Sequence, residues 1–108
     1  MGLEIIKSML EEELDRKKRA VDSFNNEMKN QELKKVYVKN INGNSYLYEN
    51  DNEDGKFHYK LIGNVKDLSE NEANRLLENS QRYDNNRNSI KSLNDDISKL
   101  ERMVKIIG

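Results

Sequence analysis

The stretch KKVYVKNINGNSYLYENDNEDGKFHYKLIG, Lys34 to Gly63, decides the fold, because it is the part of the chain with the alternating residues and turn signals of β-strands. It contains the dipeptides Asn42-Gly43 and Asp54-Gly55. Such pairs are preferred in two-residue hairpin turns, where both central residues need a positive φ. Two such turns predict a three-stranded antiparallel meander over about residues 34–63. A longer loop over residues 50–53 is the alternative for the second connection.

The two turns set the strand pairing independently, and they agree on the two faces of the sheet. The first turn pairs Tyr37 with Tyr48, and the second pairs Tyr48 with Leu61. Since side chains alternate along a strand, most aromatic residues then share one face. This aromatic face contains Tyr37, Ile41, Tyr46, Tyr48, Phe57, Tyr59 and Leu61. The opposite face contains Val36, Val38, Leu47 and Ile62, together with Ser45, Glu49, His58 and Lys60.

A first helix is predicted from Leu3 to about residue 31, because its seam residues repeat with a period of 3.5. The seam consists of Leu3, Leu10, Leu14, Lys17, Val21, Phe24, Met28 and Gln31. Lys17 is interpreted as a lysine that lays its methylene groups along the seam and keeps its ammonium in water. Charges at i,i+4 spacing, such as Glu12 and Arg16, indicate a solvated helix face rather than a nucleic-acid patch.

A second helix is predicted over about residues 70–107. Ser69 and Glu72 have the spacing of a capping box, in which the Ser hydroxyl accepts a hydrogen bond from the Glu amide. The apolar seam of this helix consists of Leu76, Tyr83, Ile90, Leu93, Ile97, Leu100, Val104 and Ile107. Asn79 and Asn86 take seam positions in its first half, which is therefore more polar.

The predicted fold is a single domain over residues 1–108, mainly α with a β insert (α+β). It is an antiparallel two-helix coiled-coil hairpin that bears a three-stranded antiparallel β-meander between the helices. The insert is expected to return the chain to where it left the first helix, which places Phe24 opposite Leu76. In this register residues 98–107 overhang their own chain by roughly 15 Å.

The overhang and the first turns of the first helix both carry a wider apolar arc than one seam requires. Such surfaces are best hidden by another copy of the chain, so a homo-oligomer is predicted, with a dimer forming a four-helix bundle favoured. The predicted oligomer interface consists of Leu3, Ile6, Leu10, Ile97, Leu100, Val104 and Ile107.

Composition limits the other classes of protein. The chain is 36% charged with a mean hydropathy of −1.05, but its charges cancel to −1 and its apolar residues are periodic, which favours extended helices over disorder. It has no Cys, which excludes disulfides and thiolate metal sites. It has neither an apolar run of membrane-spanning length nor a signal-peptide pattern, so we expect a soluble, cytoplasmic protein without membrane partners.

Few residues suggest chemistry. His58 is the only histidine, and stable metal sites recruit three or four ligands, so we interpret it as a structural histidine. The glycines are isolated, which gives no phosphate-binding loop, and no Ser has a credible base. We therefore expect no enzyme activity, no cofactor, no metal and no small-molecule substrate.

The aromatic face is the candidate binding face, with Tyr37, Tyr46, Tyr48, Phe57 and Tyr59. Such rings could stack single-stranded bases if lysines followed the phosphates. The lysines of this stretch are nearly cancelled by Glu49, Asp51, Glu53 and Asp54, which argues against a nucleic-acid partner. The competing interpretation is that the rings pack on the helices or on a partner's sheet, because a lone three-stranded sheet needs such cover.

Two resemblances follow from these residues. Gly43, Tyr46, Tyr48, Gly55, Lys56, Tyr59, Ile62 and Gly63 form a pattern that resembles a module of uncharacterised bacterial, archaeal and phage coiled-coil proteins. That resemblance implies a fold and no catalytic residue. The segment YKLIGNV at residues 59–65, which runs into a long heptad helix, is similar to the β subunit of prefoldin. This likeness implies assembly through hairpins and binding of non-native chains by apolar coiled-coil tips.

The sequence therefore favours a non-enzymatic coiled-coil assembly or adaptor protein that acts through self-association and protein–protein contacts. Two alternatives from other classes stay open. One is a prefoldin-like holdase chaperone, and the other is a single-stranded nucleic-acid accessory protein that uses the tyrosine-rich face of the sheet.

Overall fold

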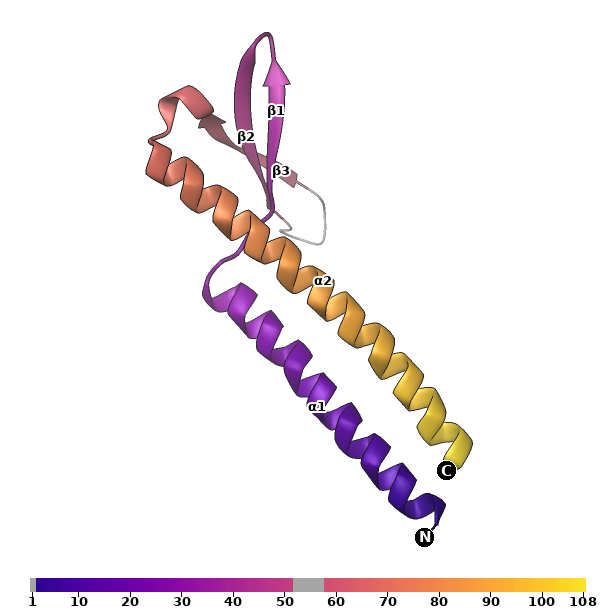
Figure 1. The fold of residues 1–108 in the computed structure, drawn as a ribbon. Coiled ribbons are helices and arrows are strands. Elements are labelled where there is room, and N and C mark those ends of the chain that lie inside the picture. Colours follow the sequence, from indigo (N-terminus) through magenta and orange to yellow (C-terminus); the bar gives the residue numbers. More distant parts are fainter. Residues whose placement is uncertain (1, 52–57) are drawn as a thin grey trace. The chain divides into compact units, whose positions relative to one another are not determined.

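The computed structural model describes residues 2–51 and 58–108, and it has the predicted order of elements (Figure 1). Two long helices flank a three-stranded antiparallel sheet, so the fold is α+β with a helical hairpin. The elements are α1 (Leu3–Asn30), β1 (Val36–Ile41), β2 (Asn44–Asp51), β3 (His58–Asn64), the short 3₁₀ helix η2 (Val65–Asp67) and α2 (Glu70–Ile107). The predicted Asp54-Gly55 turn and Phe57 lie outside the described residues.

The chain forms two compact units. The helical unit comprises Met1–Lys29 and Asn86–Gly108, and the sheet unit comprises residues 30–85. Helix α2 belongs to both, because its first residues lie in the sheet unit and its last residues in the helical unit. The expected single domain stays a prediction.

The register of the sheet is confirmed. Tyr37 pairs with Tyr48, and Tyr48 pairs with Leu61. Asn42 and Gly43 have φ values of 52° and 79°, as their two-residue turn requires. One feature was not predicted: the register between β2 and β3 shifts at Leu47/Tyr48. Such a bulge increases the local twist of the strands.

In the sheet unit, the face opposite the rings holds the most buried side chain. Leu47 projects to that face and is only 2% exposed, which makes it the most deeply buried large side chain in the described part of the chain. At the edge of the sheet, the Val36 amide donates to Ser80 Oγ at 3.0 Å, and Lys35 forms an ion pair with Asp84. These contacts place the start of β1 beside residues 80–84 of α2.

The start of α2 is capped as predicted. The Glu72 amide donates to Ser69 Oγ at 3.2 Å, which satisfies one of the free amides of the first helical turn. Just before α2, the Lys66 amide donates to Asn64 Oδ1 at 3.1 Å, and this hydrogen bond caps the start of η2. The chain therefore leaves β3 through a short capped turn and enters α2 at the same end of the sheet.

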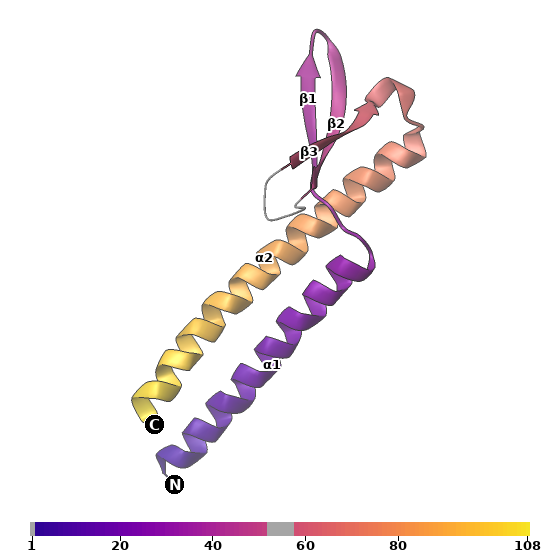
Figure 2. The ribbon, with the colours of Figure 1, turned by 180° about the vertical axis from the view of Figure 1, so that it is seen from behind.

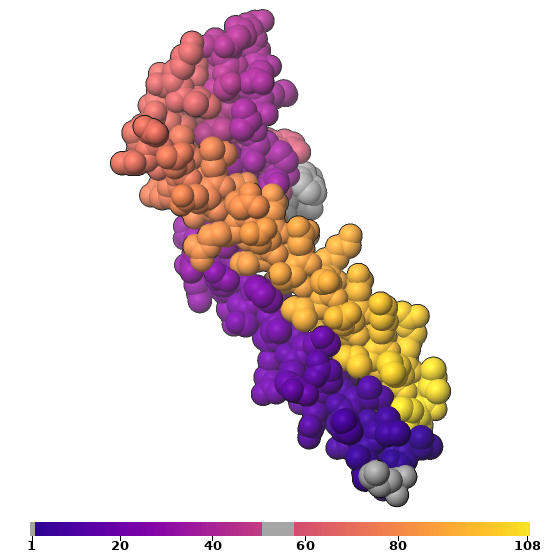
Figure 3. Space-filling view, viewed as in Figure 1, coloured from indigo at the N-terminus to yellow at the C-terminus, as the bar shows by residue number. Residues whose placement is uncertain are grey.

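The helical unit is an antiparallel pair formed by α1 and the second half of α2. Both views of the ribbon place the two termini at the same end of this unit (Figures 1 and 2), and atoms of the two helices adjoin along it (Figure 3). The predicted seam positions are half-buried in α1 from Leu10 to Met28, and Ile90 of α2 is buried. The description of this pair as a coiled coil stays a prediction.

The predicted pairing of the helices is wrong. Lys17 Nζ lies 3.4 Å from Asp96 Oδ2, and Asn86 Nδ2 donates to Glu27 Oε2 at 3.3 Å. Because the helices are antiparallel, each step forward in α1 from these contacts is a step back in α2. This count places Phe24 level with about Ile90 instead of Leu76. Residues 98–107 therefore lie beside the first half of α1, where Lys18 pairs with Glu101, and they do not overhang their chain.

The number of strands explains this difference. A meander of three antiparallel strands leaves the chain at the opposite end of the strands from where it entered, so α2 must first run back along the length of a strand. The shift from Leu76 to Ile90 is 14 residues, about 21 Å of helix. The seven residues of β3 span about 23 Å, which accounts for the shift.

Candidate binding surfaces

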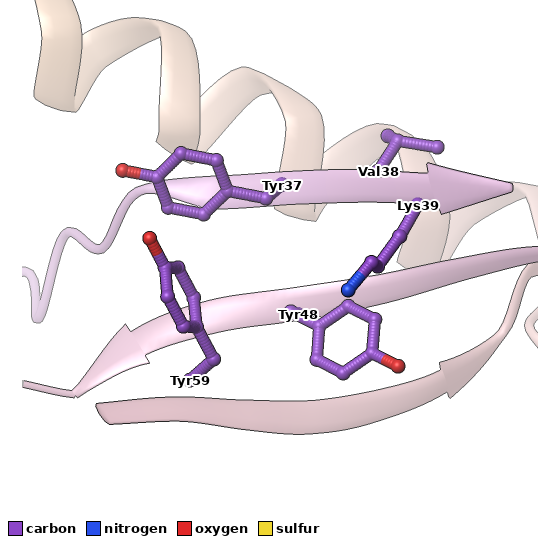
Figure 4. A pocket seen from close by; sticks show the side chains of 5 residues that line it. All are labelled: Tyr37, Val38, Lys39, Tyr48 and Tyr59. Carbon is purple, nitrogen blue, oxygen red and sulfur yellow. The ribbon is translucent and has the colours of Figure 1, made fainter. Parts of the chain in front are cut away.

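The aromatic face carries a shallow hollow of about 330 Å³ (Figure 4). This tyrosine hollow is lined by Tyr37, Val38, Lys39, Tyr48 and Tyr59. Tyr37 and Tyr59 come from the two outer strands, and their rings meet edge to face with centroids 5.4 Å apart and planes at 83°. Because the rings contact each other edge to face, they are not stacked on one another.

The local register explains why these rings gather. Tyr37 lies directly across from Tyr48, and Tyr59 lies across from Asn50, two residues further along the same side of β2. Rings of the outer strands therefore lean over the middle strand, within the reach of diagonal neighbours. Asn50 Oδ1 lies buried between them and has no hydrogen-bond partner within residues 2–51 and 58–108.

The described rings of this face differ in exposure. Tyr59 is 59% exposed and Tyr37 is 37% exposed, whereas Tyr46 and Tyr48 are half-buried. Part of the ring surface of Tyr59 and Tyr37 is therefore open to solvent. Packing of the aromatic face on the helices or on a partner's sheet stays a prediction.

The structure also separates the charges of this stretch by face. Glu49 lies on the face opposite the rings and forms an ion pair with Lys34 at 3.5 Å. Lys39 lies on the aromatic face, in the hollow, and Lys35 Nζ is 5.9 Å from the centroid of Tyr37. The described strand residues of this face include no carboxylate. Asp84 of α2 nevertheless pairs with Lys35 beside the Tyr37 ring, so Lys39 is the lysine that gives the hollow its positive charge.

His58 is exposed at the start of β3 and pairs with Asp51 in the ladder. Over residues 2–51 and 58–108, no three His, Cys, Asp or Glu side chains gather in a way that could hold a metal ion. The described part of the chain therefore offers no candidate metal centre.

The second surface lies at the end of the helical unit that carries both termini. Of the predicted oligomer interface, Leu3 and Ile6 are exposed, whereas Leu10, Ile97, Leu100, Val104 and Ile107 are half-buried. Other large apolar residues of this end are exposed as well. We define the apolar end as Leu3, Ile5, Ile6, Met9, Met103 and Ile106, whose exposed fractions range from 47% to 84%. The width of the apolar arc in the sequence was the signal for these additional residues.

A groove of about 370 Å³ on α1 adjoins this end. Its lining combines the apolar Ile6, Met9 and Leu10 with the charged Glu12, Glu13 and Arg16. A groove with an apolar floor and a charged rim is suited to an apolar side chain of another helix.

Comparison with known proteins finds no match to this chain. No family model, curated protein or solved structure matches this chain at a significant level. Among the described helices, none is long and apolar enough to cross a membrane. Arguments about function therefore depend on the two surfaces of this chain.

Proposed function

We propose that this chain is a non-enzymatic assembly or adaptor protein that binds a second copy of itself through the apolar end. The observation that supports this most directly is the exposure of large apolar side chains there. Ile106 is 84% exposed, and Leu3 and Met9 are each 63% exposed. Contiguous apolar surface of this kind on a soluble domain marks an interaction site.

The energetics favour burial of this surface. Removing one large apolar side chain from water contributes about 1.5–3 kcal/mol to the free energy of association. Several such side chains therefore offset part of the entropy that is lost when two copies associate. The chain has little core of its own: within the described residues, Leu33, Leu47 and Ile90 are its buried apolar residues.

A second copy fits this surface because the same end supplies both a groove and protruding side chains. Ile106 of one copy would enter the groove lined by Ile6 and Met9 of the other, and the reverse contact would follow by two-fold symmetry. Two helical hairpins joined in this way would form a four-helix bundle, as coiled-coil hairpins commonly do. The charges on the rim of the groove, Glu12, Glu13 and Arg16, would stay in contact with water.

The test is the molecular mass in solution over a range of protein concentrations, measured by light scattering after size exclusion. We expect a dimer for the natural sequence and a monomer for Ile106→Glu. Leu77→Glu is the matched control, because Leu77 is also an exposed apolar residue of α2, 48% exposed, and lies in the sheet unit. A natural chain that stays monomeric at high micromolar concentration contradicts the proposal.

A prefoldin-like holdase is the second candidate, and it is supported by the same exposed residues at paired helix ends. In that case the apolar end would bind non-native chains of other proteins instead of a second copy. Light scattering from an aggregating client separates the two functions. A holdase suppresses the aggregation and loses this activity in Ile106→Glu, whereas an assembly protein leaves the aggregation unchanged.

A further inference from the structure

We infer that the tyrosine hollow binds a segment of single-stranded nucleic acid, with a base against its rings and a phosphate beside Lys39. The first observation that supports this inference is the exposure of the tyrosine rings. Tyr59 is 59% exposed, and its edge-to-face contact with Tyr37 leaves flat ring surface available to a ligand. Every nucleobase has a flat face that can stack on such a ring, whatever the sequence of the strand.

The second support is the charge of the hollow. Lys39 lines it, and in the close view its ammonium extends toward the ring of Tyr48 (Figure 4). The nearest carboxylate along the middle strand, Glu49, is on the opposite face and is paired with Lys34. Asp84 of α2 is paired with Lys35, whose ammonium lies 5.9 Å from the centroid of Tyr37, so the charge offered to a ligand is that of Lys39. A flat aromatic group and a negative charge side by side are the two features of a nucleotide that this arrangement complements.

The charge also argues against other ligands of aromatic sites. Cages of aromatic residues bind quaternary ammonium groups by cation–π attraction, and the ammonium of Lys39 would repel such a cation. An enclosed small-molecule site is also a poor fit, since about 330 Å³ lies at the lower end of ligand pockets and this hollow is shallow. A strand that continues past the hollow can gain further contacts on the sheet, where the half-buried Tyr46 shares this face.

The experiment is a titration of a fluorescent single-stranded oligonucleotide of about twelve nucleotides with the full chain, read by anisotropy. Tyr59→Leu removes the ring and is expected to weaken binding by about 5- to 150-fold, the range for one stacked base. Tyr59→Phe keeps the ring and is expected to bind like the natural chain. Tyr59 is 59% exposed, so Tyr59→Leu loses the ring contact with Tyr37 but no fully buried side chain, and circular dichroism checks that both variants are folded.

Two lysines provide a matched pair for the phosphate contact. Lys39→Gln is expected to weaken binding and to reduce the slope of log K against log salt by about 0.7, as for one lost phosphate contact with a single strand. Lys60→Gln makes the same change of charge at an exposed lysine on the opposite face, across from Glu49, and is expected to leave binding unchanged.

Three results would overturn the inference. They are no binding at low salt, equal binding by Tyr59→Leu and the natural chain, and equal loss in Lys39→Gln and Lys60→Gln. The last result would mean general attraction to a charged protein. If the strand does not bind and Tyr59→Glu lowers the measured mass, the rings face the sheet of a second copy instead.

Discussion

Lys17 Nζ lies 3.4 Å from Asp96 Oδ2, and this pair shows which part of α2 faces α1. Lys17 also lies 3.5 Å from Glu13 of its own helix, and its side chain is 25% exposed. The sequence predicts a lysine that lies along the seam with its ammonium in water. The same ammonium connects the two helices at a seam position, so we expect it to contribute to their register, as single polar seam residues do in coiled coils.

A double-mutant cycle with Lys17→Met and Asp96→Asn tests this contact through the free energy of unfolding in urea. Because Asp96 is 47% exposed, the coupling energy is expected to be small, about 0.2–1 kcal/mol. Lys18 and Glu101 are the comparison pair, since both side chains are about half exposed at a separation of 3.6 Å. Their coupling is expected to be closer to zero. Zero coupling for Lys17 and Asp96 would show that their contact does not hold the register.

Asn86 is the second polar residue of the helix interface, and it is buried. Its exposed fraction is 8%, and Nδ2 donates to the Glu27 carboxylate at 3.3 Å. Asn86→Ala removes this hydrogen bond to a charged group and is expected to lower the free energy of unfolding by about 1.5–3 kcal/mol. Asn88→Ala is the control, because Asn88 is exposed on the same helix. It is expected to raise stability by a few tenths of a kcal/mol through helix propensity. Equal effects of the two substitutions would contradict the burial of Asn86.

Gly43 supplies the conformation that the first hairpin needs. Its φ is 79°, and a Cβ placed there would meet no atom within 4 Å, so the effect of a substitution comes from the backbone alone. Gly43→Ala is expected to lower the free energy of unfolding by about 1–2 kcal/mol, the cost of left-handed backbone for an ordinary residue. Gly43→Asn is expected to lose less, since Asn tolerates this conformation. Equal losses in the two variants, measured by urea unfolding, would mean that the turn relaxes to another type.

The features that could be predicted from the sequence are those that neighbouring residues determine: turns, caps and the periodicity of helices. Asn42-Gly43 fixes a turn and therefore the pairing of Tyr37 with Tyr48. The Ser69 cap fixes the start of α2, and the heptad spacing identifies the half-buried positions of both helices. Each of these depends on residues that are close in the chain, so propensities and spacing are sufficient.

The relations between distant segments could not be predicted in the same way. The pairing of Phe24 with Leu76 assumed that the sheet returns the chain to the end of the strands where it entered, which an odd number of strands does not do. Likewise, counting apolar residues did not identify Leu47, on the face with fewer apolar residues, as the most buried large side chain of the described residues. Both points concern how elements meet in space, and no local pattern encodes that.

The choice of packed face gives the most direct test of the sheet unit. Leu47 and Leu61 are both leucines of the same sheet, but Leu47 is 2% exposed on the face opposite the rings, and Leu61 is 53% exposed on the aromatic face. Leu47→Ala is expected to lower the free energy of unfolding by about 2–5 kcal/mol, because it leaves a cavity in a core of few residues. Leu61→Ala is expected to lower it by less than about 1 kcal/mol, because most of that side chain is already in water. Urea unfolding followed by circular dichroism measures both. If the two losses are reversed, the rings and not Leu47 form the packed face, and the tyrosine hollow is not open to a ligand.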